Sequence, residues 1–118
     1  MTELAFDTLQ AIMDALPANI NFVDENDIVR YCNRADKRTF VVSEGMGNKV
    51  QDCHSEAVRS QVTEILNDLK SGKAEISYVT VNSKGRKKSK RYYPVKDKSG
   101  KYIGAVELVE DITDLQKS

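Results

Sequence analysis

Residues 47–72 read GNKVQDCHSEAVRSQVTEILNDLKSG, and this stretch decides the fold. Its second part predicts a long amphipathic helix, because apolar side chains recur at spacings of three and four: Val58, Val62, Ile65, Leu66 and Leu69. Gly72 is placed to end that helix as a left-handed C-terminal cap. The first part holds the only histidine, His54, and one of the two cysteines, Cys53. This stretch is therefore the first candidate for a ligand site.

His54 lies four residues before Val58. Residues four apart lie on one face of a helix. If the first turn of the helix starts by residue 54, we expect the imidazole on the apolar face.

Short segments on both sides of this helix predict β-strands, because they are rich in β-branched and aromatic side chains and are bounded by polar or glycine-containing turns. The strand segments are residues 19–24, 28–33, 74–82, 88–96 and 102–112. Pro94 has no backbone N–H, so we expect it at an edge or an irregularity of the sheet. Strands split around a helical middle predict an α+β fold, with a five-stranded antiparallel sheet and helices on one face.

Two further helical segments complete the pattern. An amphipathic helix is predicted from about residue 2 to residue 15, because apolar side chains again recur at helical spacing and Pro17 must end it. This helix has to lay its apolar face on the domain or on another subunit. Residues 34–42 show no clean period, and we expect a short helix with an irregular connection there.

The composition is that of one globular domain. The 118 residues suffice for a single hydrophobic core, and 18 basic residues balance 18 acidic ones. This balance suggests neither nucleic acid nor an anionic membrane as a partner, and the basic run at residues 84–91 lies at a predicted hairpin turn, where charge is usually solvated. The sequence has no signal segment and no apolar run of about 20 residues, so we expect a cytoplasmic protein.

The order of these segments resembles that of a PAS domain, the sensory module of many bacterial signalling proteins. The matching residues are Phe22-Val23-Asp24, Ile28-Val29-Arg30-Tyr31-Cys32-Asn33-Arg34-Ala35, Gly47-Asn48-Lys49-Val50 and Asp111-Ile112-Thr113. Together with residues 92–95 and 104–107, the stretch 47–55 resembles a PAS-like subgroup that usually carries Cys-His-Pro-Pro before the long helix. That subgroup is often the C-terminal part of proteins with a hemerythrin-like region. Here Ser55-Glu56 stands in place of the two prolines.

The resemblance implies a ligand-sensing or protein-interaction domain in bacterial-type signal transduction. It implies a division into an N-terminal helix for dimerisation or capping (1–17), a sensor domain (18–114) and the start of a C-terminal linker (115–118). It also implies a pocket between the long helix and the sheet. We expect ligand contacts there from His54, Phe22, Val58, Val62, Leu66 and Tyr93.

The resemblance raises two cofactors, flavin and haem, although the sequence does not identify one. Val50 occupies the position of the reactive cysteine of photosensory flavin-binding relatives and cannot form a thiol adduct, so flavin is not expected. The axial histidine position of haem-binding relatives falls on Val62. His54 can still serve as a ligand of haem iron, and Cys53 beside it offers a thiolate. The alternative is a structural histidine, hydrogen-bonded to the backbone or to a neighbouring carboxylate.

Catalysis is not expected from these residues. Cys53 and His54 are adjacent, and adjacent residues point about 100° apart on a helix, so they are poorly placed to share a proton. Two cysteines are too few for a disulfide framework and fit no zinc spacing, so we expect both thiols to be reduced. Glu107 interrupts the last predicted strand, and it either faces solvent or enters the pocket with Arg30, Arg91 or Tyr93. We expect solvent, because charged residues are mostly exposed.

Three interpretations of function stay open. The domain senses a small molecule, or it is a haem-based gas or redox sensor with His54 as axial ligand, or it is a dimerisation module without a ligand. We expect a homodimer through the N-terminal helix, because an apolar stripe at the edge of a small domain seeks a partner. The contact residues would be Leu4, Leu9, Ile12 and Met13.

Overall fold

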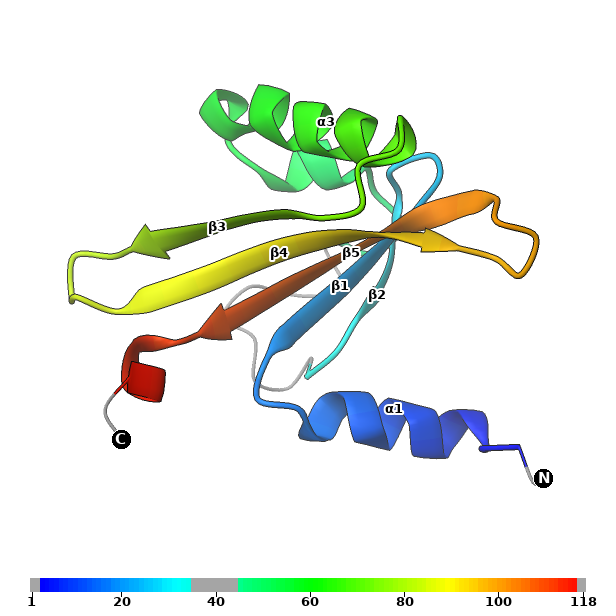
Figure 1. Ribbon diagram of the computed structural model, residues 1–118, viewed down its shortest axis with the longest axis horizontal. Coiled ribbons are helices and arrows are strands. Elements are labelled where there is room, and N and C mark those ends of the chain that lie inside the picture. Colours follow the sequence, from blue (N-terminus) through cyan, green and yellow to red (C-terminus); the bar gives the residue numbers. More distant parts are fainter. Residues whose placement is uncertain (1–2, 35–44, 117–118) are drawn as a thin grey trace.

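Five antiparallel strands form one sheet at the centre of the molecule. The computed structural model describes residues 3–34 and 45–116. The strands are β1 (Asn19–Asp24), β2 (Val29–Cys32), β3 (Ile76–Val81), β4 (Lys87–Lys96) and β5 (Tyr102–Asp111). They lie in the order β2-β1-β5-β4-β3, so that the last strand of the chain occupies the middle of the sheet (Figure 1). The predicted α+β fold with a five-stranded antiparallel sheet is confirmed.

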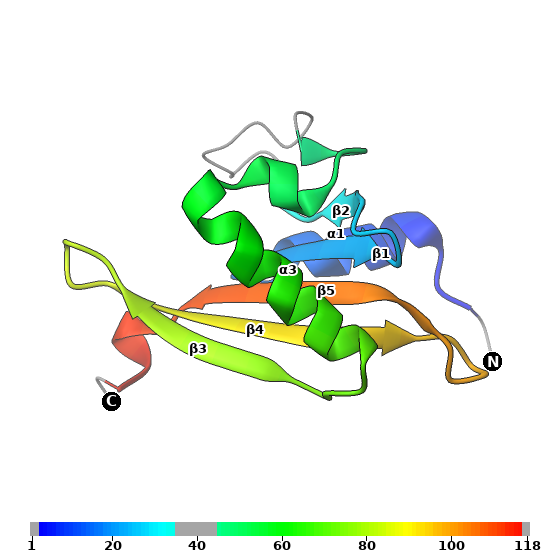
Figure 2. The ribbon, with the colours of Figure 1, turned by 90° about the horizontal axis from the view of Figure 1, so that it is seen from above.

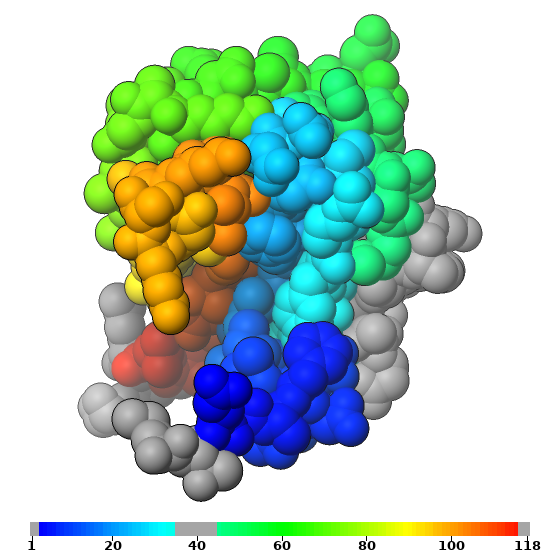
Figure 3. Space-filling view, turned by 90° about the vertical axis from the view of Figure 1, so that its right-hand side faces the viewer, coloured from blue at the N-terminus to red at the C-terminus, as the bar shows by residue number. Residues whose placement is uncertain are grey.

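Helices lie on either side of this sheet. The helical segments are α1 (Phe6–Ala15), η2 (Val50–Cys53), α3 (Glu56–Lys70) and η3 (Thr113–Gln116). Helix α3 crosses one face of the sheet (Figure 2), whereas α1 lies on the side away from α3 (Figures 1 and 3). Within the described residues, no helix has the length and the apolar character needed to cross a membrane. The short helix predicted at residues 34–42 falls almost wholly outside the described ranges.

The hydrophobic core lies between α3 and the sheet. Every residue that α3 buries belongs to the apolar stripe seen in the sequence: Val62, Ile65, Leu66 and Leu69. Opposite them lie buried side chains of the sheet: Val23, Val29, Tyr92 and Ala105. Burying one large aliphatic side chain contributes roughly 1.5–3 kcal/mol, so this contact is what holds α3 on the sheet.

The start of α3 differs from the prediction for His54. The helix begins at Glu56, and Ser55 before it has the extended backbone of an N-cap residue. His54 follows the 3-10 turn η2 with φ −122° and ψ 158°, so it is not part of the first helical turn. Ser55 makes no side-chain capping hydrogen bond, so its extended backbone alone marks the start of the helix. The imidazole is therefore placed by η2 and not by the stripe of α3.

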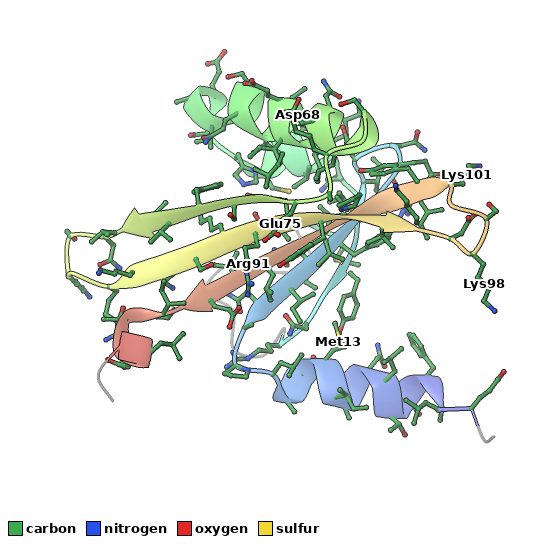
Figure 4. The ribbon with its side chains drawn as sticks, in the orientation of Figure 1. Met13, Asp68, Glu75, Arg91, Lys98 and Lys101 are labelled. Atoms are coloured by element: carbon green, nitrogen blue, oxygen red, sulfur yellow. The ribbon has the colours of Figure 1, made fainter. Side chains whose placement is uncertain are left out.

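Asn33 connects α1 to the first hairpin. It is 1% exposed, and its amide oxygen accepts a hydrogen bond from the backbone N–H of Ile20 at 2.7 Å. Its amide nitrogen donates to the carbonyl oxygens of Met13 (2.8 Å) and Ala18 (3.1 Å). Figure 4 shows Met13 between α1 and the sheet. One buried side chain thus ties the end of the helix to β1.

Pro94 lies where the sequence predicts it. In β4 it pairs with Ala105 of β5, and the ladder between β3 and β4 ends two residues earlier, at Ile76 opposite Tyr92. The missing N–H of Pro94 therefore has no neighbouring strand to serve on the β3 side.

Candidate functional site

A cavity of about 290 Å³ lies between α3 and the sheet. Most of its wall is apolar and comes from Val23, Val29, Val50, Val62, Leu66 and Ala105. Cys32, Gly45, Cys53 and His54 also line it, and Asn21, Tyr92 and Glu107 add polar groups from the sheet. Small-molecule sites usually measure roughly 300–1,000 Å³ and combine apolar walls with a few polar groups. The cavity is at the low end of that range in size and typical of it in composition.

A polar cluster forms the sheet side of the cavity. The Glu107 carboxylate accepts hydrogen bonds from the amide nitrogen of Asn21 (2.8 Å) and from the hydroxyl of Tyr92 (2.6 Å). Asn21 and Tyr92 are the two cross-strand neighbours of Glu107, in β1 and β4. The hydroxyl of Tyr78 lies 3.3 Å from that of Tyr92. Sheet register therefore brings together residues that are far apart in the sequence.

Tyr92 keeps its proton in this cluster. Burial raises the pKa of Tyr92 far above its usual value, and the neighbouring Glu107 carboxylate raises it further. A protonated hydroxyl is the donor that a carboxylate needs. The pair is therefore a hydrogen bond with a fixed direction, from Tyr92 to Glu107.

His54 lies on the helical side of the cavity. Its Nδ1 is 2.9 Å from the carbonyl oxygen of Val50. Because a carbonyl oxygen only accepts, Nδ1 carries the proton, and in the neutral imidazole Nε2 is left as an acceptor. The backbone of η2 thus fixes the orientation of the ring.

Cys53 differs from His54 in its chemistry. Its Sγ lies 3.7 Å from the carbonyl oxygen of Lys49. Partial burial raises the pKa of the Cys53 thiol, and the negative charge of Asp52 raises it further. Both effects favour the thiol over the thiolate that would bind a metal. Within the described residues, neither Cys32 nor Cys53 forms a disulfide.

Three of the predicted ligand contacts line the cavity, namely His54, Val62 and Leu66. Val58 packs against the adjoining core without lining the cavity. Phe22 and Tyr93 alternate along their strands with lining residues and so lie on the opposite face of the sheet.

Glu107 is placed differently from the sequence prediction, which puts it in solvent. It lines the cavity and accepts hydrogen bonds from Asn21 and Tyr92. The partners considered for it are engaged elsewhere. Arg30 pairs with Asp24 (2.8 Å), Arg91 pairs with Glu110 (2.6 Å), and the Tyr93 hydroxyl donates to Glu75 (3.3 Å). Glu75 and Arg91 are labelled in Figure 4.

A metal centre built from protein side chains is not formed by the described residues. Within residues 3–34 and 45–116, no three His, Cys, Asp or Glu side chains are grouped to hold a metal ion. Any iron bound at His54 would have to arrive with its own equatorial ligands, as in haem.

The sequence model of the PAS domain family matches residues 9–113. No curated protein matches. A C-terminal domain from Streptococcus mutans is 26% identical, with a TM-score of 0.86 over 97% of this chain and 90% of that chain.

Two more distant structures share the fold. The PAS domain of BvgS from Bordetella pertussis is 17% identical, with a TM-score of 0.71 over 91% of this chain and 85% of that one. VqmA from Vibrio cholerae, described as a dimer, is 15% identical, with a TM-score of 0.72 over 95% of this chain and 54% of that one. VqmA is also known in a complex with a ligand and DNA.

Proposed function

Because the chain belongs to the PAS domain family, we propose that it is a sensory domain in signal transduction and binds a small molecule between α3 and the sheet. A sensory box sensor histidine kinase from Vibrio cholerae shares this fold, which is consistent with a sensory role. The observation that carries the proposal is the cavity, which has apolar walls and a polar cluster from three strands. The ligand in a VqmA structure is consistent with it. The proposed function is binding without catalysis.

The strands that line the cavity also lead to the ends of the described chain. α1 precedes β1 and η3 follows β5, and both strands contribute cavity residues, Asn21 and Glu107 among them. A ligand shifts a protein between two arrangements only when it binds one of them better. In this proposal the ligand favours one position of α3 over the sheet, and β1 and β5 carry the change to α1 and η3.

The test is to identify what the purified protein releases on denaturation, by mass spectrometry. Ala105 is 2% exposed and lines the cavity, so Ala105→Leu fills part of the volume. Val79, which is 56% exposed on β3, gives the control Val79→Leu. We expect one small molecule from the wild type and the control, and none from Ala105→Leu. If no protein releases a molecule, a dimerisation module without a ligand becomes the better proposal.

Haem is the second candidate, because the orientation of His54 suits it. A haem-ligating histidine donates its other ring N–H to a backbone carbonyl or a carboxylate, as His54 does to Val50. The cavity of about 290 Å³, however, would have to widen to hold a porphyrin, so the described residues fit a smaller molecule better. Hemin titration of wild type and His54→Ala decides this. Identical Soret spectra would exclude His54 as the ligand.

We also propose a homodimer through α1. The helix buries none of its own residues, and Leu4, Leu9 and Ile12 are 65%, 47% and 45% exposed, whereas Met13 is half-buried. Exposed apolar side chains in a row mark a contact with another protein surface, and VqmA offers a dimeric precedent. Sedimentation at micromolar concentration should give a dimer mass for the wild type and a monomer mass for Leu9→Glu. Gln10→Glu on the same helix is the control, and a monomeric wild type contradicts the proposal.

A further inference from the structure

Glu107 brings a negative charge to the cavity that the described chain does not neutralise. Within residues 3–34 and 45–116, no lysine or arginine forms an ion pair with it, and Arg30 and Arg91 are paired with other carboxylates. Glu107 is half-buried, and a carboxylate that is partly removed from water is costly unless it is hydrogen-bonded and paired with a cation. The two hydrogen bonds to Glu107 supply donors for the carboxylate, but within the described residues no cation is paired with it.

The hydrogen bonds of the polar cluster all run toward Glu107. Tyr92 donates its only proton to the carboxylate, so in its contact with Tyr78 the Tyr78 hydroxyl is the donor. Asn21 donates through its amide nitrogen, which fixes the orientation of the amide. The Asn21 amide oxygen is buried and has no hydrogen-bond partner among the described residues. The acceptor that the cluster offers to a ligand is therefore the Glu107 carboxylate.

The opposite wall adds another acceptor. His54 uses its Nδ1 proton on the carbonyl oxygen of Val50, which in the neutral imidazole leaves Nε2 as an acceptor. His54 comes from the helical layer and Glu107 comes from the sheet, so each wall has an acceptor to offer. A ligand that satisfies both walls must supply donors.

Resting on the proposed sensory function, we infer that the ligand is a small cationic amine with an apolar body. The ammonium group donates to the Glu107 carboxylate and supplies the missing positive charge. The body packs against apolar side chains such as Val62 and Leu66. An anionic ligand would instead meet the charge of Glu107. Charge complementarity therefore favours amines over carboxylates and phosphates at this site.

The experiment uses three probes with one body and different charge: phenethylamine, 2-phenylethanol and phenylacetate. Each is titrated into the full chain and followed by amide NMR shifts and calorimetry. The variants are Glu107→Gln, which removes the charge while keeping a similar shape, and Glu110→Gln, the same change on β5 at a residue paired with Arg91. Ala105→Leu reports whether the probes occupy the cavity. Circular dichroism checks that each variant is folded.

We expect the wild type to bind the amine more tightly than the alcohol, and the alcohol more tightly than the carboxylate. Glu107→Gln should weaken the amine by about tenfold or more and leave the alcohol nearly unchanged. Glu110→Gln should match the wild type, and Ala105→Leu should weaken the amine and the alcohol together. The ranking of probes on the wild type tests the inference even if Glu107→Gln does not fold.

Two outcomes would overturn the inference, and they differ from failure of the proposed function. If phenylacetate binds in the cavity as well as the amine does, or if Glu107→Gln leaves amine affinity unchanged, the cavity is a ligand site but not one for amines. If no probe binds the wild type and mass spectrometry finds no released molecule, both the amine inference and the proposed sensory function fail.

Discussion

Gly104 leaves no room for a side chain where β5 passes β1. Its φ is +155°, a backbone conformation that favours glycine, and a Cβ there would overlap the carbonyl oxygen of Val23 and the ring of Phe22. The Phe22 ring occupies the space that the missing side chain leaves. The role of Phe22 is therefore to cover Gly104 on the face away from the cavity.

We predict that Gly104→Ala lowers the free energy of unfolding by about 2–4 kcal/mol, because it adds a steric overlap to backbone strain. Gly100→Ala is the control. Gly100 also has a positive φ, +88°, but a Cβ there meets nothing within 4 Å, so only strain of about 1 kcal/mol is expected. Urea unfolding measures both values. Equal losses of unfolding free energy in Gly104→Ala and Gly100→Ala would contradict the prediction, because they would show that the contact with Phe22 and Val23 adds nothing.

Asn33 gives a second prediction at the scale of one residue. Asn33→Ala removes hydrogen bonds to Ile20, Met13 and Ala18 in a site that is 1% exposed. Buried backbone groups left without partners are costly, so we expect a loss of about 2–4 kcal/mol. The exposed helix residue Asn67 provides the control Asn67→Ala, with a change near zero. Thermal and urea unfolding measure the stability of both variants. Equal stabilities of Asn33→Ala and Asn67→Ala would contradict the prediction.

The sequence predicts the helical wall of the candidate site better than its sheet wall. Val62 and Leu66 follow from the periodicity of one helix, which is a local pattern. Asn21, Tyr92 and Glu107 meet only because β1, β5 and β4 pair in one register, and register depends on contacts between distant segments. Because charged residues are mostly exposed, the sequence alone places Glu107 in solvent. The pairing of β5 with β1 and β4 places it in the cavity instead.

At the scale of elements, the junction between β5 and η3 is held by Asp111. Its carboxylate accepts hydrogen bonds from the Thr113 hydroxyl (2.7 Å), the Thr113 backbone N–H (3.0 Å) and the Arg86 guanidinium (3.0 Å). Thr113 also accepts a bond from the backbone of Lys87 at 2.7 Å. The end of β5 is thus fastened to the start of β4.

We predict a stability difference at this junction that depends on pH. The bonds from Thr113 and then Arg86 hold the pKa of Asp111 well below its usual value. A lowered folded-state pKa stabilises the protein above the unfolded-state pKa of about 4, and this contribution is lost as pH falls toward the folded-state value. Asp111→Asn should therefore be less stable than wild type at pH 7, with a smaller difference at pH 3.

Urea unfolding at several pH values measures this difference. Asp52, which is exposed, supplies the control variant Asp52→Asn. A gap between wild type and Asp111→Asn that stays constant from pH 7 to pH 3 would contradict the prediction.

Element types follow from the sequence more reliably than element starts. The strand at residues 19–24 agrees with β1, and the apolar stripe agrees with the buried face of α3. The predicted N-terminal helix began near residue 2, whereas α1 starts at Phe6. Helix starts depend on which backbone N–H groups find partners outside the helix, and hydrophobic spacing does not report this.

At the scale of the whole molecule, stability should decrease from the centre of the sheet outward. β5 pairs with β1 on one side and β4 on the other, whereas α1 has no buried residue. Hydrogen exchange should therefore be slowest in β5 and fastest in α1 at low protein concentration. If α1 dimerises, its protection should rise with concentration while that of β5 stays constant. Protection of α1 equal to that of β5 in dilute solution would contradict this order.

The central position of β5 also has a consequence for how the chain acquires its structure. Asn19 pairs with Val109, so the first strand finds its inner neighbour only in the last one. The chain between β1 and β5 must close into a long loop, at a cost in conformational entropy, before the two strands gain any contact. Such long-range pairing makes folding slow. During synthesis, β1 and β2 can form a hairpin as soon as they leave the ribosome, but they cannot join β4 until β5 has emerged. The sheet is therefore assembled from its two halves in one late step, and until then β1 and β4 each keep an edge that is open to aggregation.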